Sequence, residues 1–272
     1  AMFIAAGGRS GPGPGIGLCL AVSIGFYMAA GAANAINMVL ERDLDLKMGR
    51  TGKRPTVTRT IPARAALLFA LALMVGSFAL LWGAANLLSA MLAMAGLAFY
   101  VIVYTLLLKR RTWVNIVIGG AAGAFPPLVG WAAVTGDLSP LAWCLFGIIF
   151  LWTPVHFWAL AILIKDDYAR AGVPMLPVVR GVRATVVQIA FYTALTVAIS
   201  ALPVLLQGRN GQSAVGWIYL AAAGLLNVVL VLRSAQLYRH PDRPRASSLF
   251  HYSMIYLALL FLAMAVDRAH WI

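Results

Sequence analysis

The chain has 272 residues, of which 62% are hydrophobic and only 11% are charged, with a mean hydropathy of +0.88. This composition excludes an ordinary soluble domain and predicts a membrane protein with several spanning segments. The net charge of +13 does not indicate a nucleic-acid partner, because the basic residues alternate with apolar runs in the way that sets membrane topology.

Apolar runs of about 20 residues, the length that crosses a bilayer as an α-helix, recur along the whole chain. They predict one all-α domain over 1–272, a polytopic transmembrane helical bundle. The opening residues, AMFIAA, are too short to span, and we expect them to be the tail of a further helix that would bring the bundle to nine. The eight complete spans are expected at 15–40, 63–84, 86–108, 113–134, 140–164, 184–206, 213–233 and 247–267.

All but three of the 21 Lys and Arg residues lie in four segments on one side of this predicted membrane, at 41–64, 109–112, 165–183 and 233–246. Short loops rich in Lys and Arg stay in the cytoplasm. We therefore expect a multi-pass protein of a bacterial-type inner membrane, with these segments cytoplasmic. The lipid bilayer is its surroundings, and the basic loops would attract anionic lipid.

The first of these segments begins with a row of oxygen-bearing side chains. Asn37, Glu41 and Asp45 repeat every four residues, and such a step on an α-helix turns by about 40° and rises by roughly 6 Å. If the helix persists, the three side chains line one face of its end, with Asp43 close by. Such a row suits a hard cation such as Mg²⁺, which shares its remaining positions with phosphate oxygens. A solvated loop whose charges pair with one another is the alternative.

Basic residues follow the acidic row and recur at the next cytoplasmic segment. Arg50 and Arg54 lie just behind it, and Lys109 and Arg110 open the second segment. Guanidinium groups bind phosphates through two hydrogen bonds at once. The order of acids and then bases therefore predicts a metal site next to a diphosphate site, although a topology signal explains Lys109 and Arg110 equally well.

The later spans contain polar residues at membrane depth. Asn115 is expected to line a polar cavity or to bond a neighbouring helix, because a buried amide needs partners. Pro126 and Pro127 predict an interruption of the same span. His156 lies among aromatic residues in WTPVHFW. It is either a hydrogen-bonded packing residue or a ligand or proton-transfer group for a bulky planar substrate.

A second acidic pair follows the span that contains His156. Asp166 and Asp167 begin the third cytoplasmic segment, on the side predicted for the first acidic row. Five of the eight acidic residues of the chain therefore lie in two loops on one side. Two such loops facing one another could hold Mg²⁺ between them and bridge the phosphates of a substrate.

Three runs of sequence resemble a known family. Asn37-x-x-x-Glu41-x-x-x-Asp45 followed by RTxxRP resembles the first aspartate-rich motif of the intramembrane UbiA-type prenyltransferases. The runs YTLLLKRRTWVNIVIGGAAGAFPPLVGWAAVTG and FLWTPVHFWALAI, the latter with DDYARAGVPMLPVV downstream, resemble the haem-farnesylating branch of that family. The resemblance covers about 35–185 in detail. Two features depart from the wider family: Glu41 stands where Asp is usual, and Asp166 and Asp167 are adjacent.

The resemblance implies a fold, a reaction and a set of roles. The fold is a nine-helix bundle with a central cavity that opens to the cytoplasm and to lipid. The reaction transfers farnesyl from farnesyl diphosphate to a vinyl group of haem b, with addition of water, and the product would serve haem–copper oxidases, which implies partners in haem synthesis or oxidase assembly. Mg²⁺ would be held by the acidic residues and one amide: Asn37, Glu41, Asp43, Asp45, Asp166 and Asp167. The diphosphate would be bound by the basic residues Arg50, Arg54, Lys109 and Arg110. Haem would be bound by two spanning residues, His156 and Asn115.

Two other functions remain open from the sequence. A related prenyltransferase could act on an aromatic acid or quinone precursor, since only the runs around WTPVHFW and GVPMLP favour a porphyrin. A transporter with acidic gating loops is the alternative from another class. The charges argue against the transporter, because they lie at one membrane face and not near the midplane.

Overall fold

The computed structural model describes residues 1–7, 13–49, 51–207 and 213–269, and the regular secondary structure of this part of the chain is almost entirely helical. A single β-bridge between Gln207 and Ser213 is its only extended pairing there. The elements in chain order are α1 (Met2–Ala6), α2 (Ile16–Leu40), α3 (Arg42–Asp45), α4 (Ala63–Ala84), α5 (Leu87–Ala98), η1 (Phe99–Leu108), α6 (Asn115–Thr135), α7 (Pro140–Leu163), α8 (Lys165–Ala171), α9 (Leu176–Val179), α10 (Gly181–Ala201), η2 (Leu202–Leu205), α11 (Trp217–Arg239) and α12 (Arg243–Ala269).

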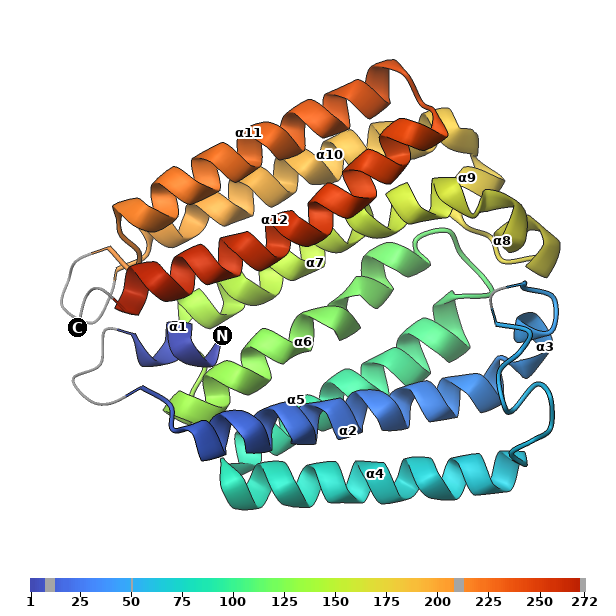
Figure 1. Cartoon of the computed structure of the whole chain (residues 1–272), viewed down its shortest axis with the longest axis horizontal. Coiled ribbons are helices and arrows are strands. Elements are labelled where there is room, and N and C mark those ends of the chain that lie inside the picture. Colours follow the sequence, from blue (N-terminus) through green and yellow to red (C-terminus); the bar gives the residue numbers. More distant parts are fainter. Residues whose placement is uncertain (8–12, 50, 208–212, 270–272) are drawn as a thin grey trace.

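Eight helical segments of the described chain are long and apolar enough to cross a membrane, which confirms the expected spans. Their ends agree with the sequence expectations within a few residues, apart from α11, which continues to Arg239. Figure 1 shows α2, α4, α5 and α6 in one half of the bundle and α7, α10, α11 and α12 in the other. Helices α6 and α7 pack against each other where the halves meet, and they are the most deeply buried of the spanning helices.

One end of the bundle gathers the short helices that interrupt the polar loops. Figure 1 shows α3, α8 and α9 at this end, and α1 with the last turn of α12 at the other. We call the first end the charged end, because residues 41–49, 51–64, 109–112 and 164–180 lie there. The turns joining the spans therefore place both acidic segments on the same side, as the charge pattern predicts.

The span expected as a plain helix over 86–108 changes its geometry halfway. Helix α5 ends at Ala98, and η1 continues as a π-helix, in which the Lys109 amide donates to the Tyr104 carbonyl at 2.9 Å, five residues back. π-Helical segments are rare and are frequent at functional sites. The wider helix places Tyr100 and Tyr104 on the wall of one cavity. The apolar sequence of this span contains no signal for that change.

The interruption predicted at Pro126 and Pro127 is wrong, because α6 runs without a break from Asn115 to Thr135. A proline inside a helix removes one amide donor and frees the carbonyl four residues before it. The carbonyls concerned belong to Ala122 and Gly123, and both of these residues line a cavity. Prolines are tolerated inside a spanning helix where the chain is enclosed by protein or borders a cavity, and this part of α6 meets that condition.

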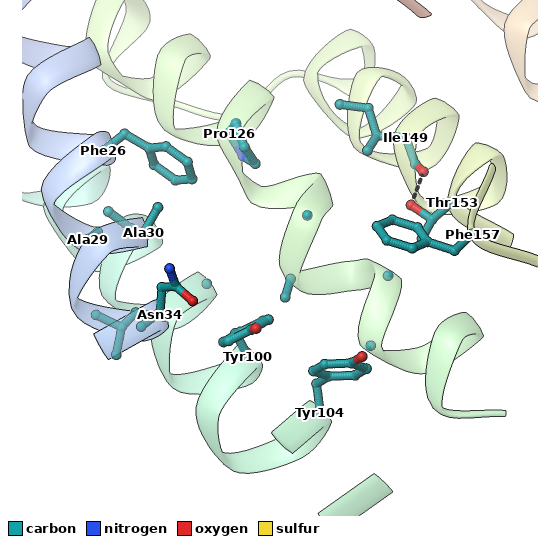
Figure 2. Close-up of a pocket in the computed structure, with 18 of the residues that line it drawn as sticks. Phe26, Ala29, Ala30, Asn34, Tyr100, Tyr104, Pro126, Ile149, Thr153 and Phe157 are labelled. Atoms are coloured by element: carbon teal, nitrogen blue, oxygen red, sulfur yellow. Dashed lines mark hydrogen bonds between the residues drawn. The ribbon is translucent and has the colours of Figure 1, made fainter. Parts of the chain in front are cut away.

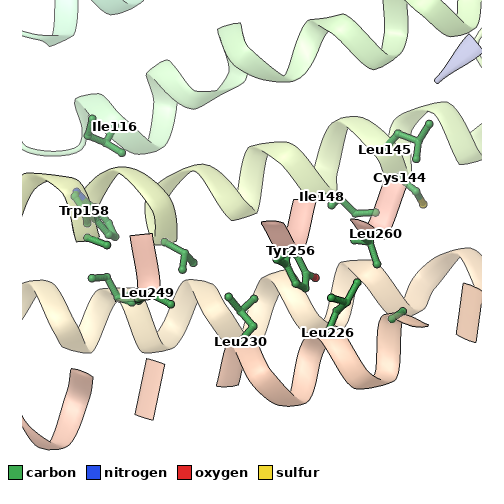
Figure 3. Close-up of a cluster of buried hydrophobic side chains, with 14 of the residues drawn as sticks. Ile116, Cys144, Leu145, Ile148, Trp158, Leu226, Leu230, Leu249, Tyr256 and Leu260 are labelled. Atoms are coloured by element: carbon green, nitrogen blue, oxygen red, sulfur yellow. The ribbon is translucent and has the colours of Figure 1, made fainter. Parts of the chain in front are cut away.

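The two halves are held together by a large apolar core. Leu145, Ile148 and Trp158 of α7 belong to the same buried cluster as side chains of α11 and α12, including Leu230 and Tyr256 (Figure 3). All five side chains are buried. Because α7 carries residues of both this core and the cavity described below, packing of the C-terminal helices fixes one wall of the site.

The end opposite the charged end is fixed by an acid and a base next to each other in α12. The buried carboxylate of Asp267 accepts hydrogen bonds from the amides of Gly216, Ile218 and Tyr219, where α11 begins. Arg268 donates to the carbonyls of Ile4 and Ala214. These contacts satisfy helix ends that lack partners of their own, and they tie α1 and α11 to α12.

Candidate functional site

The row of Asn37, Glu41 and Asp45 survives although α2 ends at Leu40. The amide of Glu41 donates to the Asn37 carbonyl, and the amide of Asp45 donates to the Glu41 carbonyl, both at 2.9 Å. Helical spacing therefore continues across the junction between α2 and α3. The three residues are 3%, 1% and 3% exposed. The predicted row thus forms, and its members are far more buried than a solvated loop would leave them.

Two of the buried carboxylates form ion pairs with bases from the predicted diphosphate set. The Lys109 ammonium donates to Glu41 Oε2 at 2.5 Å, and Arg54 donates to Asp45 Oδ2 at 2.7 Å. A buried carboxylate without a partner is strongly destabilising. The pairs therefore neutralise the acidic row, and the Lys109–Glu41 pair joins the end of η1 to the end of α2.

A third pair lies at the surface of the same cluster. Arg110 donates to both carboxylate oxygens of Asp43, at 2.7 and 2.6 Å, and to the Leu40 carbonyl at 3.1 Å. These hydrogen bonds hold the pKa of Asp43 below its usual range. Both side chains are well exposed, so the pair contributes little to stability. It does keep a guanidinium at the edge of the acidic row.

The cluster also contains buried oxygens that lack a hydrogen-bond partner. Asn37 donates to Thr105 Oγ1 at 3.2 Å, and Asn115 donates to the Lys109 carbonyl at 3.3 Å. Glu41 Oε1 and Asn115 Oδ1 are buried and accept no hydrogen bond. Oxygen acceptors in a buried acidic site are the ligand type that a hard divalent cation takes. The residues present therefore fit Mg²⁺, although the described chain holds no group of three or more His, Cys, Asp and Glu side chains close enough for a metal ion.

The second acidic pair lies at the charged end but outside this cluster. Asp166 is exposed in the first turn of α8, and Asp167 is paired with Arg170 of the same helix. Figure 1 shows α3 and α8 at the same end of the bundle, in different halves. Arg50, predicted to bind diphosphate, lies outside the described residues. The structure thus places both acidic segments at one end without joining them in one site.

A cavity of about 460 Å³ opens between α2, α5, η1, α6 and α7. Figure 2 shows Phe26 and Asn34 of α2, the tyrosines of η1, and Thr153 and Phe157 of α7 around it. Asn34 lies one helical turn before the acidic row, so the row stands beside one end of the cavity. The lining is mostly apolar, with Ala and Gly residues on α2 and α6. The arrangement suits a ligand with a charged head and a long apolar tail.

Tyr104 stands between the charged cluster and this cavity. Its ring lines the cavity, lies 5.4 Å from the Tyr100 ring between centroids, and has the Lys109 ammonium 5.6 Å from its centroid. It packs directly against Gly119 of α6, where a Cβ would come within 2.3 Å of the ring. The sequence analysis gave Tyr100 no role in the site. Two tyrosines four residues apart before Lys109 were the available signal.

His156 is held among aromatic rings beside the cavity. It stacks on Trp152 and on Phe250, each at 4.6 Å between centroids, and its Nδ1 lies 2.8 Å from Ser253 Oγ. It is not among the residues that line the cavity, whereas Trp152 and Phe157 are. With both ring faces covered, the geometry favours the packing role, in which His156 joins α7 to α12. Its role toward haem stays a prediction.

Comparisons with known proteins agree on one family. The UbiA prenyltransferase family matches residues 1–264. The chain is 66% identical over 94% of its length to a protoheme IX farnesyltransferase of Thermus thermophilus, and it spans 41% of that relative's length. It is 52% identical to the protoheme IX farnesyltransferase of Deinococcus radiodurans, with 99% of this chain and 87% of the relative covered.

Solved structures share the fold at low sequence identity. A structure described as digeranylgeranylglyceryl phosphate synthase gives a TM-score of 0.75 at 19% identity, covering 98% of this chain and 90% of that one. A UbiA homologue from Archaeoglobus fulgidus bound to DMAPP and Mg²⁺ gives 0.68 at 16% identity, covering 97% and 92%. At these identities the two structures bear on the fold alone.

Proposed function

Because this chain belongs to the UbiA prenyltransferase family, we propose that it transfers farnesyl from farnesyl diphosphate to a vinyl group of haem b and so produces haem O and diphosphate. The names of its relatives from Thermus thermophilus and Deinococcus radiodurans support this choice of substrates. The observation that carries the reaction type is the buried row of Asn37, Glu41 and Asp45 beside an apolar cavity. A charged head and an isoprenoid tail require those two environments side by side.

We propose Mg²⁺ as the metal, held by Asn37, Glu41 and Asp45 with Asp43 nearby. The unpartnered Glu41 Oε1 supports this assignment, as does the A. fulgidus homologue described with Mg²⁺. When bound, the metal would neutralise charge that develops on the leaving diphosphate. Asp166 and Asp167 are proposed for a second metal, on the ground of their position at the charged end.

The basic side chains would hold the diphosphate. Arg54, Lys109 and Arg110 surround the acidic row, and Arg50 belongs to the same segment. Donors fixed in position before the reaction stabilise the charge that appears on the bridging oxygen as the bond to farnesyl C1 breaks. The leaving group thus departs toward the charged cluster, while the apolar cavity keeps bulk water from the allylic cation.

The remaining step forms a carbon–carbon bond. The terminal carbon of a haem vinyl group donates its π electrons to farnesyl C1, which leaves a cation on the adjacent carbon. A water molecule adds its oxygen there and loses a proton, giving the hydroxyl of the product. Tyr100 and Tyr104 line the cavity beside the cluster, where the cation would form. Asn115 is proposed to contact haem through its unpartnered Oδ1. His156 is proposed to orient haem without touching it, through Trp152, on which it stacks and which lines the cavity.

We further propose a bacterial-type inner membrane as the location, with the charged end in the cytoplasm, where farnesyl diphosphate is soluble. Eight apolar helices and the positive-inside distribution of Lys and Arg support this placement. A reporter fused after Ala269 would then be exposed outside the cytoplasm. A reporter found in the cytoplasm would show that the orientation is the reverse of the one proposed.

The test uses membranes that contain the chain, incubated with haem b, farnesyl diphosphate and Mg²⁺, with extracted haems resolved by mass. We expect a product with the mass of hydroxyethylfarnesyl haem that disappears with EDTA and in Asp45→Asn. Asp137→Asn is the matched control, because Asp137 is exposed in the loop between α6 and α7 at the other end. Prenylation of an aromatic acid in place of haem would refute the substrate assignment, and no consumption of any prenyl diphosphate would refute the reaction.

A further inference from the structure

The buried acids of the site are paired with the very bases proposed to hold the diphosphate. Glu41 holds Lys109, and Asp45 holds Arg54. Both carboxylates are almost fully buried, so each needs a positive partner whenever no metal is present. The two bases together carry the same charge as one divalent cation. The cluster is therefore electrically balanced without a ligand. In this state the acids are not free to bind a metal ion, and the bases are not free to bind diphosphate.

Lys109 satisfies only half of the Glu41 carboxylate. Its ammonium lies 2.5 Å from Oε2, while Oε1 is buried and has no hydrogen-bond partner. An unsatisfied buried acceptor costs free energy that a second cationic ligand would recover. The unpartnered Oε1 is therefore a second observation, separate from the ion pairs, which indicates that the row accepts a further cation.

Lys109 is also placed to leave the carboxylate. It follows the last residue of η1, its side chain is 17% exposed, and its ammonium has the Tyr104 ring as a second neighbour at 5.6 Å. A lysine ammonium on a flexible stem can change partners without moving the backbone, and an aromatic face attracts a cation in transit. Release from Glu41 therefore requires rotation of one side chain.

We propose that Lys109 and Arg54 exchange partners during substrate binding, from Glu41 and Asp45 to the diphosphate, as the metal takes over the two carboxylates. This inference rests on the proposed function and specifies how its two ligands bind. Metal alone would leave two bases unpaired, and diphosphate alone would leave two buried acids unpaired. When both bind, every charge keeps a partner. Metal and diphosphate therefore bind cooperatively, and each raises the affinity for the other by the same factor.

The exchange is tested by binding, separately from turnover. The probes are Mg²⁺ alone, and a farnesyl diphosphate analogue with sulfur in place of the bridging oxygen, with and without Mg²⁺, measured by calorimetry on the purified full chain. We expect each probe to raise the affinity for the other at least about tenfold, within the usual range of such coupling. Metal and phosphate would also attract each other by direct contact. Variants must therefore separate the coupling that comes from this contact from the coupling that comes from the exchange of ion-pair partners.

Lys109→Met supplies the separation, with Arg111→Met as its control. Arg111 is exposed in the same loop, and the structure gives it no ion pair among the described residues. Both variants remove one positive charge from the charged end. The exchange predicts that Lys109→Met binds Mg²⁺ alone about fivefold or more tightly than Arg111→Met does, with weaker coupling to the analogue. A lysine that only contacts diphosphate would leave the affinity for Mg²⁺ alone equal in the two variants.

Further outcomes are also decisive. If Lys109→Met is unstable alone but recovers its melting temperature when Mg²⁺ is added, the result supports the exchange, because the metal then replaces the missing ammonium. If the variant folds in neither condition, Glu41→Gln decides: freed Lys109 should tighten binding of the analogue in EDTA more than the control Asp137→Asn does, since Asp137 is exposed and lies away from the proposed metal sites. Independent binding of metal and analogue to the unsubstituted chain overturns the exchange but leaves the proposed function standing. Binding of neither probe overturns both.

Discussion

Substitution of Gly119 by alanine should disable the site without unfolding the bundle. A Cβ at this position would lie 2.3 Å from Cδ2 and 3.0 Å from Cγ of Tyr104. Carbon atoms pack at about 3.5 to 4 Å, so the tyrosine ring must retreat by roughly 1 Å. Such overpacking costs about 1–3 kcal/mol. A shift of about 1 Å beside reacting atoms can lower a rate about a hundredfold.

We therefore expect Gly119→Ala to reduce kcat/KM for the proposed haem farnesylation about a hundredfold while the melting temperature falls by only a few degrees. The assay is the conversion of haem b by purified enzyme, with products resolved by mass. Gly123→Ala is the matched control, since Gly123 lines the same cavity one turn further along α6 and its Cβ would meet nothing within 4 Å. Its kcat/KM should stay within a few-fold.

A double substitution tests whether the tyrosine ring transmits the effect. In a Tyr104→Leu background the added methyl has no ring to displace, so Gly119→Ala should cost far less than it does alone, and the two effects should not add. Full additivity would show that Gly119 acts by another route. Equal loss of activity in Gly119→Ala and Gly123→Ala would refute the argument from ring displacement.

Three further predictions concern residues around and away from the site. Thr105→Val removes the acceptor of Asn37, and the Mg²⁺ concentration for half-maximal rate should rise about tenfold or more, as for other groups that orient metal ligands, whereas Thr105→Ser should restore it. His156→Ala should lower the melting temperature, because two ring stacks and the Ser253 contact are lost, while the absorption spectrum of bound haem stays unchanged; a shifted spectrum would instead indicate a haem ligand. Asp267→Asn should destabilise the protein by about 1–3 kcal/mol, because it weakens the hydrogen bonds from the amides of Gly216, Ile218 and Tyr219 at the start of α11. The activity of the folded fraction should not change, since Asp267 lies at the opposite end; a loss of turnover at equal stability would contradict this.

Local sequence was sufficient for the spans and for part of the site. Apolar length alone predicts the spanning helices, because the hydrocarbon core of a bilayer fixes how long a helix must be. The four-residue spacing of Asn37, Glu41 and Asp45 predicts their common face, because backbone hydrogen bonds preserve helical spacing across the junction of α2 and α3. The role of these residues as metal ligands stays a prediction.

Other features depend on contacts between segments far apart in the chain. The ion pair of Glu41 with Lys109 joins residues 68 positions apart. No local sequence pattern could indicate that Lys109, predicted to bind phosphate, forms an ion pair with Glu41. The continuity of α6 through Pro126 and Pro127 depends on the cavity and helices around it.

The sequence by itself determined where helices cross the membrane and on which side the charges gather, because hydropathy and charge act residue by residue along the chain. Only the tertiary structure decided that η1 becomes a π-helix, that the Tyr104 ring lies against Gly119, and that acids and bases neutralise one another at the mouth of a cavity. The physical reason is that helix geometry, ring position and partner choice each minimise the free energy of a packed site whose atoms come from several helices at once.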